Sequence, residues 1–314
     1  MPHDPGPRSS EPGTRQLVPA GSAAKAMPDE AVRPADASTQ DADVGRDTSG
    51  RETYRKLRLA TLVIAVYLGV GVVTQRVNAG CWQTSISAYY WTATHSAFVA
   101  ALCAIGVALV VNKGSSYVED VVLNFSGFLA FGVATVPAPR EPLCGGPGLP
   151  AGFDPAALVR NNALAVLVAG ILVEAVQVVI DRRAGRGGHA WVRPVGWLVI
   201  AGFVVWYLTW PASFLQYGHV VSADTMFVGI VVVVLLNGFG ARHSPSRPLF
   251  GRLYYGVAAA MAATLVTVIA VAGTGHAGDH VVIVVEALLI VEFVAFWLVQ
   301  TVELWNVPTR ADLT

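Results

Sequence analysis

Three glutamates within long apolar stretches are the residues of this sequence best suited to chemistry. They are Glu174, Glu286 and Glu292. An ionised carboxyl is costly in an apolar environment, so such a group faces a protein interior, where it carries a proton or is hydrogen-bonded by a neighbouring helix. Glu286 and Glu292 are six residues apart, which places them roughly 120° apart around a helix. At most one of these two therefore faces any single small site.

A run of hydroxyl and aromatic side chains, SISAYYWT, separates two apolar stretches. If the run is extended, Ser85, Ser87 and Tyr89 share one side of the backbone and can form a hydrogen-bonded lid over a buried carboxyl. The alternative is packing of its rings, with the neighbouring tryptophans, at the headgroup level of a membrane. A serine nucleophile would also need a base and an oxyanion pocket, and the sequence has no GxSxG turn. The candidate polar pocket consists of Ser85, Ser87, Tyr89, Tyr90, His95, Asn124, Asp224 and Glu286.

The stretch GTGHAGDHVVIVVE contains a candidate metal site. His276 and His280 are four residues apart, so a helix would align their imidazoles, and zinc accepts two such ligands with a third histidine and a carboxylate. The glycines of the stretch favour a loop instead, and no HExxH motif occurs. Solvated or hydrogen-bonded loop histidines are therefore the alternative to a metal site.

The three cysteines divide into a pair and a single residue. Cys81 and Cys144 fall in two loops expected on the same, oxidising side of a membrane, whereas Cys103 lies within an apolar segment. This distribution predicts a disulfide between Cys81 and Cys144 and a packed thiol at Cys103. The alternative is two free thiols too far apart to join.

The elements that must position these residues are membrane-spanning helices. The chain has 314 residues, of which 54% are hydrophobic and only 13% charged, with a mean hydropathy of +0.54. We predict an all-α fold, a polytopic transmembrane helix bundle of about eight spans, or seven if one segment is re-entrant. The expected spans are 57–75, 95–112, 119–137, 161–180, 195–214, 224–240, 253–273 and 281–304.

The remaining chain divides into a tail and charged loops. Residues 1–50 lack apolar periodicity, which predicts a disordered cytoplasmic tail before a bundle formed by residues 51–314. The Lys and Arg residues are concentrated in alternate loops, so the positive-inside rule places both ends in the cytoplasm. The excess of arginine over lysine, 18 to 3, suggests a bacterial source and hence a bacterial plasma membrane. Because the basic residues are spread among short loops, the lipid bilayer is the expected partner and nucleic acid is not.

Parts of the sequence resemble a family of uncharacterised bacterial multi-pass membrane proteins. The resemblance lies in SISAYYWTATHSAFVAALCAIGVALVVNKG, NFSGFLAFGVATVP and EALLIVEFVAFWLV. It implies a multi-pass bundle with a Ser/Tyr-rich outer loop and brings no assigned activity. The positions that match its pattern are Ser85, Ser87, Tyr89, Tyr90, Asn124 and Glu286.

These residues support three hypotheses of function. The first is an integral membrane protein with a polar pocket at its outer face that binds a small ligand or a lipid headgroup. The second is a metal-dependent membrane enzyme that acts on lipid headgroups, and the third is a small-solute transporter that uses the intramembrane glutamates. The sequence indicates no cofactor, substrate or oligomeric state.

Overall fold

The computed structural model describes most of the chain and divides it into two units. The units are Met1–Gly45 and Arg46–Thr314. The described residues are 34–139, 143–146, 148–149, 153–183, 193–243, 248–274, 280–307 and 309–310. In the first unit these are helical residues from Pro34 onward, and the second unit contains the bundle.

The regular structure of the described residues is entirely helical, which confirms the predicted all-α class. One short 3₁₀ helix follows the first of eight α-helices. The elements are α1 (Pro34–Ala79), η1 (Ser87–Trp91), α2 (His95–Val111), α3 (Tyr117–Thr135), α4 (Pro155–Arg183), α5 (Arg193–Thr209), α6 (Pro211–Arg242), α7 (Pro248–Thr274) and α8 (Val281–Glu303).

Six of the helices among the described residues are long and apolar enough to cross a membrane. They lie in α1, α3, α4, α6, α7 and α8, and two shorter apolar helices lie in α2 and α5. The helices also carry many exposed Val, Leu and Ile side chains. Exposure of such side chains is unfavourable in water but favourable in the hydrocarbon core of a membrane. The protein is therefore a multi-pass integral membrane protein, as the composition predicts.

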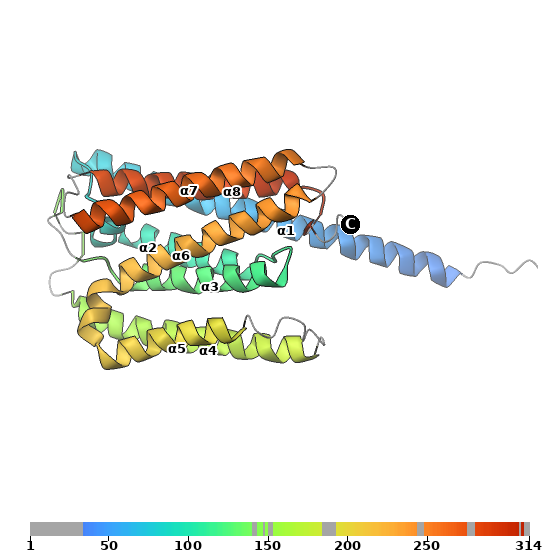
Figure 1. Cartoon of the computed structure of the whole chain (residues 1–314), viewed down its shortest axis with the longest axis horizontal. Helices are drawn as coiled ribbons and strands as arrows, with labels where there is room; N and C mark the ends of the chain where they lie inside the picture. The colour runs from blue at the N-terminus through green and yellow to red at the C-terminus, as the bar shows by residue number, and fades with distance from the viewer. Residues whose placement is uncertain are drawn as a thin grey trace, which may run out of the picture. The chain divides into compact units, whose positions relative to one another are not determined.

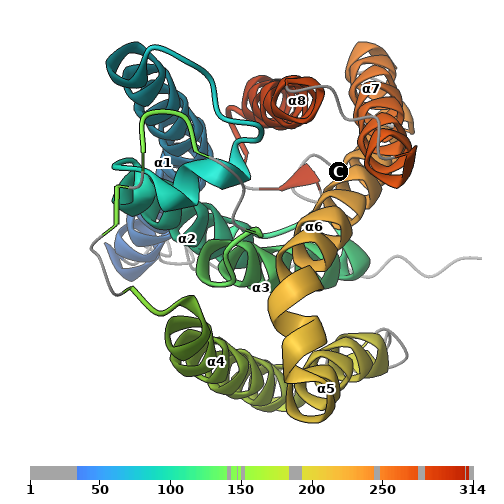
Figure 2. The same cartoon turned by 90° about the vertical axis from the view of Figure 1, so that its left-hand side faces the viewer.

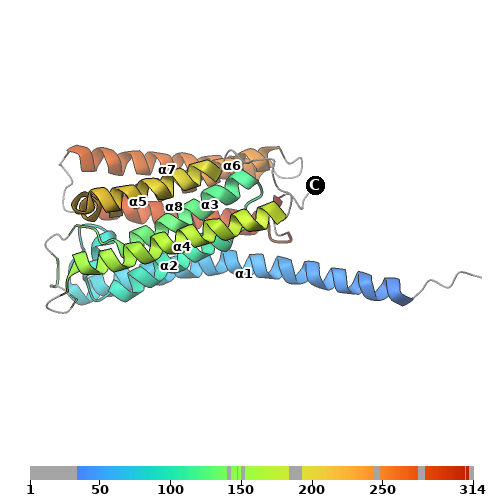
Figure 3. The ribbon, with the colours of Figure 1, turned by 90° about the horizontal axis from the view of Figure 1, so that it is seen from below.

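Within the second unit, α4 and α5 lie beside the other helices rather than among them. Figures 1 and 2 show this pair on one side of α3, away from α7 and α8. Figure 3 shows the bundle from the side of the pair, with α4 running across α2 and α3. The largest cluster of buried apolar side chains joins residues of α2, α3, α6, α7 and α8.

Close packing of α2 on α3 depends on two glycines. A Cβ added at Gly106 would lie 2.8 Å from the Gly127 carbonyl oxygen, and one added at Gly127 would lie 2.6 Å from the Gly106 oxygen. The two backbones are therefore in direct contact, an approach that only glycine permits.

The boundary between the fifth and sixth predicted spans was wrong. The sequence placed residues 215–223 in a loop, yet α6 already begins at Pro211 and follows α5 after the single residue Trp210. Proline suits the first turn of a helix because its missing N–H needs no partner there. Two polar residues of the expected loop, His219 and Ser222, are each only 2% exposed. They face the protein interior.

The first helix also begins before the predicted span. Its described part starts at Pro34, so the predicted tail of residues 1–50 overlaps it. Residues 1–33 of that tail lie outside the described residues. The disordered tail stays a prediction.

Candidate functional site

The SISAYY run folds into the turn η1 and not into an extended lid. The backbone N–H of Tyr89 donates to the Ile86 carbonyl over 3.1 Å, and the Ser85 hydroxyl accepts from the Ala88 N–H over 2.9 Å. These bonds stabilise a tight turn. The expected alternation of Ser85, Ser87 and Tyr89 on one side of a strand was therefore wrong, and Ser85 caps the turn instead.

The aromatic rings of η1 are core residues. Tyr89 and Tyr90 are 0% and 1% exposed, and Trp91 is 3% exposed, so these rings pack inside the protein. Their expected depth, at the headgroup level of a membrane, stays a prediction. The ring of Tyr90 packs edge-on against His95, whose Nδ1 lies 2.6 Å from the Tyr90 carbonyl oxygen. Burial raises the pKa of the Tyr90 phenol to about 12. These rings hold the turn against the bundle.

Glu286, in the second turn of α8, reaches directly into this turn. One carboxyl oxygen accepts the backbone N–H of Ile86, and the other lies 3.2 Å from the Ser87 hydroxyl oxygen. The start of α8 is joined to the same segment because the Ile283 N–H donates to the Thr84 carbonyl over 3.2 Å. Asp224 of α6 is close enough to interact electrostatically with Glu286.

His219 of α6 approaches Ser87 from the other side. Its Nε2 lies 2.8 Å from the Ser87 hydroxyl oxygen, and its Nδ1 lies 2.6 Å from the Val136 carbonyl oxygen. A carbonyl oxygen can only accept, so Nδ1 carries a hydrogen. His219 was not among the residues predicted for the polar pocket, because the predicted spans left it in a loop before its helix.

The resulting chain of Glu286, Ser87 and His219 has two proton arrangements. In one, the Glu286 carboxyl donates to Ser87 and the Ser87 hydroxyl donates to a neutral His219 imidazole. In the other, His219 is an imidazolium that donates to Ser87, and Ser87 donates to the Glu286 carboxylate. Both arrangements contain the same number of protons and satisfy the same hydrogen bonds. The serine hydroxyl can therefore pass a proton between the acid and the base.

A small cavity meets this chain at its carboxyl and hydroxyl. It measures about 80 Å³ and is lined by Ser87, Glu286 and apolar side chains that include Phe98, Met226 and Phe293. A cavity of this size has room for a few waters or a small molecule. Its shape and lining fit a small apolar group that carries one hydrogen-bonding function.

The geometry of this site does not suit a serine hydrolase. His219 is a suitable base for Ser87, as such an enzyme requires. An oxyanion pocket needs free N–H donors beside the nucleophile. The N–H of Ile86 is bound to Glu286 and that of Ala88 to the Ser85 hydroxyl. Acyl transfer would have to break these bonds first.

The remaining candidate residues lie elsewhere. Tyr89 is in the same turn but is not among the hydrogen-bond partners of Glu286 in the described structure. Asn124 lines a separate cavity with Glu174, so its expected place in the polar pocket was wrong. The Thr264 hydroxyl donates to Glu292 over 2.9 Å, which links α7 to α8.

The predicted metal site is largely outside what the structure describes. His276 lies outside the described residues, and His280 is exposed just before α8. Within the described ranges, no group of three His, Cys, Asp or Glu side chains is arranged to hold a metal ion.

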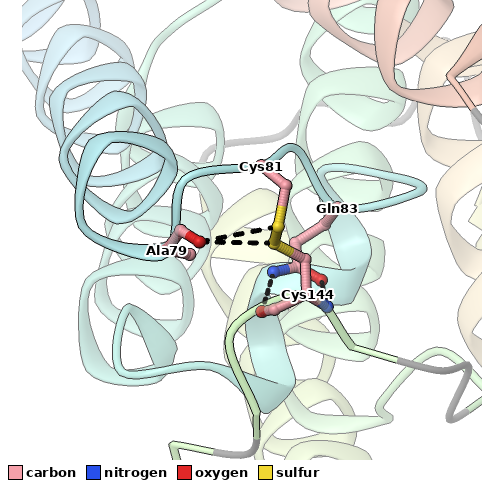
Figure 4. Close-up of a disulfide and its surroundings, with 4 residues drawn as sticks. All are labelled: Ala79, Cys81, Gln83 and Cys144. Atoms are coloured by element: carbon pink, nitrogen blue, oxygen red, sulfur yellow. Dashed lines mark hydrogen bonds between the residues drawn. A yellow bond between two sulfur atoms is a disulfide. The ribbon is translucent and has the colours of Figure 1, made fainter.

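Cys81 and Cys144 are joined by a disulfide in this structure, with their Cα atoms 6.1 Å apart. Figure 4 shows that the bond lies beside the end of α1, where both sulfurs approach the Ala79 carbonyl. The side-chain amide of Gln83 also pairs with the backbone of Cys144, at 2.9 Å and 3.2 Å. The segment that carries Cys144 is thus attached to the residues before η1.

A second buried polar cluster, which we call the Arg310 network, lies at the opposite end of the bundle and was not predicted. The Arg310 guanidinium pairs with both carboxylate oxygens of Glu303, at 3.0 Å and 2.6 Å. Their side chains are 9% and 0% exposed. The Tyr254 hydroxyl donates to the same carboxylate over 2.6 Å.

Asn237 connects this pair to the start of α3. Its oxygen accepts from Arg310 and Gln300, at 3.2 Å and 3.1 Å, and its Nδ2 donates to Glu119 over 2.6 Å. The second Glu119 oxygen accepts the Ser115 N–H over 2.8 Å. The network therefore joins α3, α6, α7 and α8 to the segment after α8, and its buried charges and amides satisfy one another.

Comparison with known proteins does not identify a family for this chain. No protein-family model, no curated protein and no solved structure was found to match the chain. The family resemblance suggested by the SISAYY run is thus not supported by these comparisons, and only the multi-pass helical class stands.

Proposed function

We propose that this protein crosses the plasma membrane of a bacterium eight times, with both ends in the cytoplasm, and binds a small ligand in a polar pocket at its outer end. The eight helices support the number of spans, although two of them are short. The positive-inside rule supports the orientation, because basic residues gather at the end of the bundle opposite the disulfide. Those described include Arg51, Arg55, Lys56, Arg58, Lys113, Arg182, Arg183, Arg242, Arg252 and Arg310.

The disulfide tests this orientation, because such a bond persists on the oxidising side of a membrane. In a Cys103→Ala background on intact cells, we expect a membrane-impermeant maleimide to label the protein only after an impermeant reductant is added. Cys81→Ala should expose Cys144 to the reagent without reductant. Full labelling before reduction would exclude the disulfide, and labelling only after cell lysis would reverse the orientation.

The observation that carries the binding proposal is the contact of Ser87 with both Glu286 and His219 beside the apolar cavity. A ligand with one polar atom can replace part of this hydrogen bonding while its apolar portion fills the cavity. Because the acid and the base share a proton through Ser87, the same site can bind a neutral hydroxyl or carbonyl group, or exchange a proton with an amine or an acid.

Filling the cavity should remove the ligand. Ala223 lines the cavity, so Ala223→Leu introduces bulk there, and Ala263→Leu adds the same bulk at an exposed position of α7. We expect mass spectrometry of organic extracts to find one small compound in stoichiometric amount with the wild type and Ala263→Leu but not with Ala223→Leu. Equal amounts of the compound from all three proteins, or no compound from the wild type, would contradict the proposal.

A proton-coupled transporter is the second candidate, and the proton path from Glu286 to His219 favours it. Glutamine at position 286 keeps a donor for Ser87 but has no proton to transfer. Loss of proton flux in Glu286→Gln proteoliposomes would distinguish transport from binding alone. The metal-dependent enzyme has no comparable support among the described residues.

A further inference from the structure

A larger cavity separates the α4 and α5 pair from α2 and α3. It measures about 410 Å³, and its lining is apolar apart from Asn124 and Glu174. The phenylalanines Phe125, Phe128 and Phe131 of α3 form one wall. This volume lies within the range of about 300–1,000 Å³ typical of small-molecule sites. None of its lining residues lines the cavity beside Glu286.

A polar cavity of about 230 Å³ continues from this apolar one at the end of the bundle opposite the disulfide. The two share six lining residues, among them Asn124, Glu174 and Gly196. The polar cavity is also lined by Lys113, Asp120 and other hydrogen-bonding side chains, namely Tyr54, Asn112, Tyr117 and Gln177. The combined space is therefore amphipathic, with Glu174 where the apolar part meets the polar part.

The position of this space points to a membrane lipid as its occupant. Of the six long candidate spans, α4 is the least buried, with 11% of its apolar window inside the protein. Its exposed side chains include Leu172 and Val176, so hydrocarbon surrounds the helix that closes the cavity. A lipid can enter laterally and leave its headgroup at the polar end.

The charged side chains of the polar cavity favour one class of lipid headgroup over another. Among the described residues that line the polar cavity, one side chain is cationic, Lys113, and two are acidic, Asp120 and Glu174. A phosphate suits the lysine, and an ammonium suits the carboxylates. An anionic headgroup without an ammonium would meet two acids of its own sign.

We propose that this amphipathic cavity binds one zwitterionic phospholipid, with its ammonium at Glu174, its phosphate at Lys113 and an acyl chain along the α3 phenylalanines. The site is independent of the ligand pocket beside Glu286, since it shares no lining residue with it.

Two glycines of α5 provide a matched pair of variants. A Cβ at Gly196 would have no heavy atom within 4 Å, and neither would one at Gly202. Gly196 lines both parts of the cavity, whereas Gly202 lines neither. Gly196→Leu therefore fills the cavity, and Gly202→Leu makes the same change outside it.

The test is native mass spectrometry of delipidated protein incubated with phosphatidylethanolamine or with phosphatidylglycerol of identical acyl chains. We expect the wild type and Gly202→Leu to retain one phosphatidylethanolamine, and Gly196→Leu to retain roughly tenfold less. Glu174→Gln, which keeps the shape, should reduce the preference for phosphatidylethanolamine by roughly fivefold to tenfold.

Equal retention by the two glycine variants would overturn the site, and equal binding of the two lipids by the wild type would overturn its headgroup assignment. Size-exclusion chromatography checks that each variant is folded. If Gly196→Leu fails to fold, Ala169→Leu fills the same apolar cavity and the same comparison applies.

Discussion

Replacing Arg310 with alanine should lower the free energy of unfolding by about 3–5 kcal/mol, because it leaves the buried carboxylate of Glu303 without its counter-charge. Both oxygens of that carboxylate are bound by the guanidinium, and the Glu303 side chain is fully buried. Asn237 would also lose a donor. The expected effect therefore exceeds that of an ordinary surface substitution.

The control is an exposed ion pair, between Lys56 and Glu52. Its side chains are 75% and 56% exposed, so Lys56→Ala should cost only about 0–1 kcal/mol. Thermal and denaturant unfolding in detergent measure both variants. Replacing Arg310 and Glu303 together with Met and Leu should recover part of the loss, because the two partners of the ion pair are then removed together. An Arg310→Ala protein as stable as Lys56→Ala would show that the network contributes little.

The second large effect is expected at Ser87. Ser87→Ala removes the hydroxyl that separates Glu286 from His219, which leaves one Glu286 oxygen and the His219 Nε2 without the hydrogen bond to Ser87 and costs about 1–3 kcal/mol. Glu286→Gln should cost little, since the amide still accepts the Ile86 N–H and donates to Ser87. Ser96→Ala, at an exposed position of α2, is the control.

A double-mutant cycle tests the contact itself. The cost of Ser87→Ala combined with Glu286→Leu should be less than the sum of the two single changes, because each change already removes the same interaction. Thermal unfolding of the four proteins gives the coupling energy. Strictly additive costs would mean that the turn and the glutamate do not interact in solution.

The helices were predictable to the extent that their apolar side chains face lipid or the core. The segments predicted at 95–112 and 281–304 agree with α2 and α8 within one residue at each end. The prediction failed at the start of α6, where His219 and Ser222 face the interior. A hydropathy pattern cannot distinguish a polar residue that has a buried partner from one in water.

The two polar clusters differ in how far the sequence indicated them. A polar run near a glutamate in an apolar segment suggested that Ser87 and Glu286 meet. The histidine that completes their chain comes from another helix, and no spacing in the sequence relates it to them. The Arg310 network was even harder to predict from the sequence. Its members come from four helices and a terminal segment, so only the tertiary fold shows that they meet.

The Arg310 network also has a consequence for the order of events during synthesis. Asn237 follows Glu119 by 118 residues, and Arg310 follows Ser115 by 195 residues. At about 5–20 residues per second, the ribosome needs roughly 10–40 s to cover the longer interval. Helix α3 must therefore enter the membrane while Asn237, which donates to Glu119 in the folded protein, does not yet exist. Until then, water, the insertion machinery or a bound proton must stabilise the Glu119 carboxyl. The Arg310 network can form only after Arg310, its last residue in the chain, has left the ribosome.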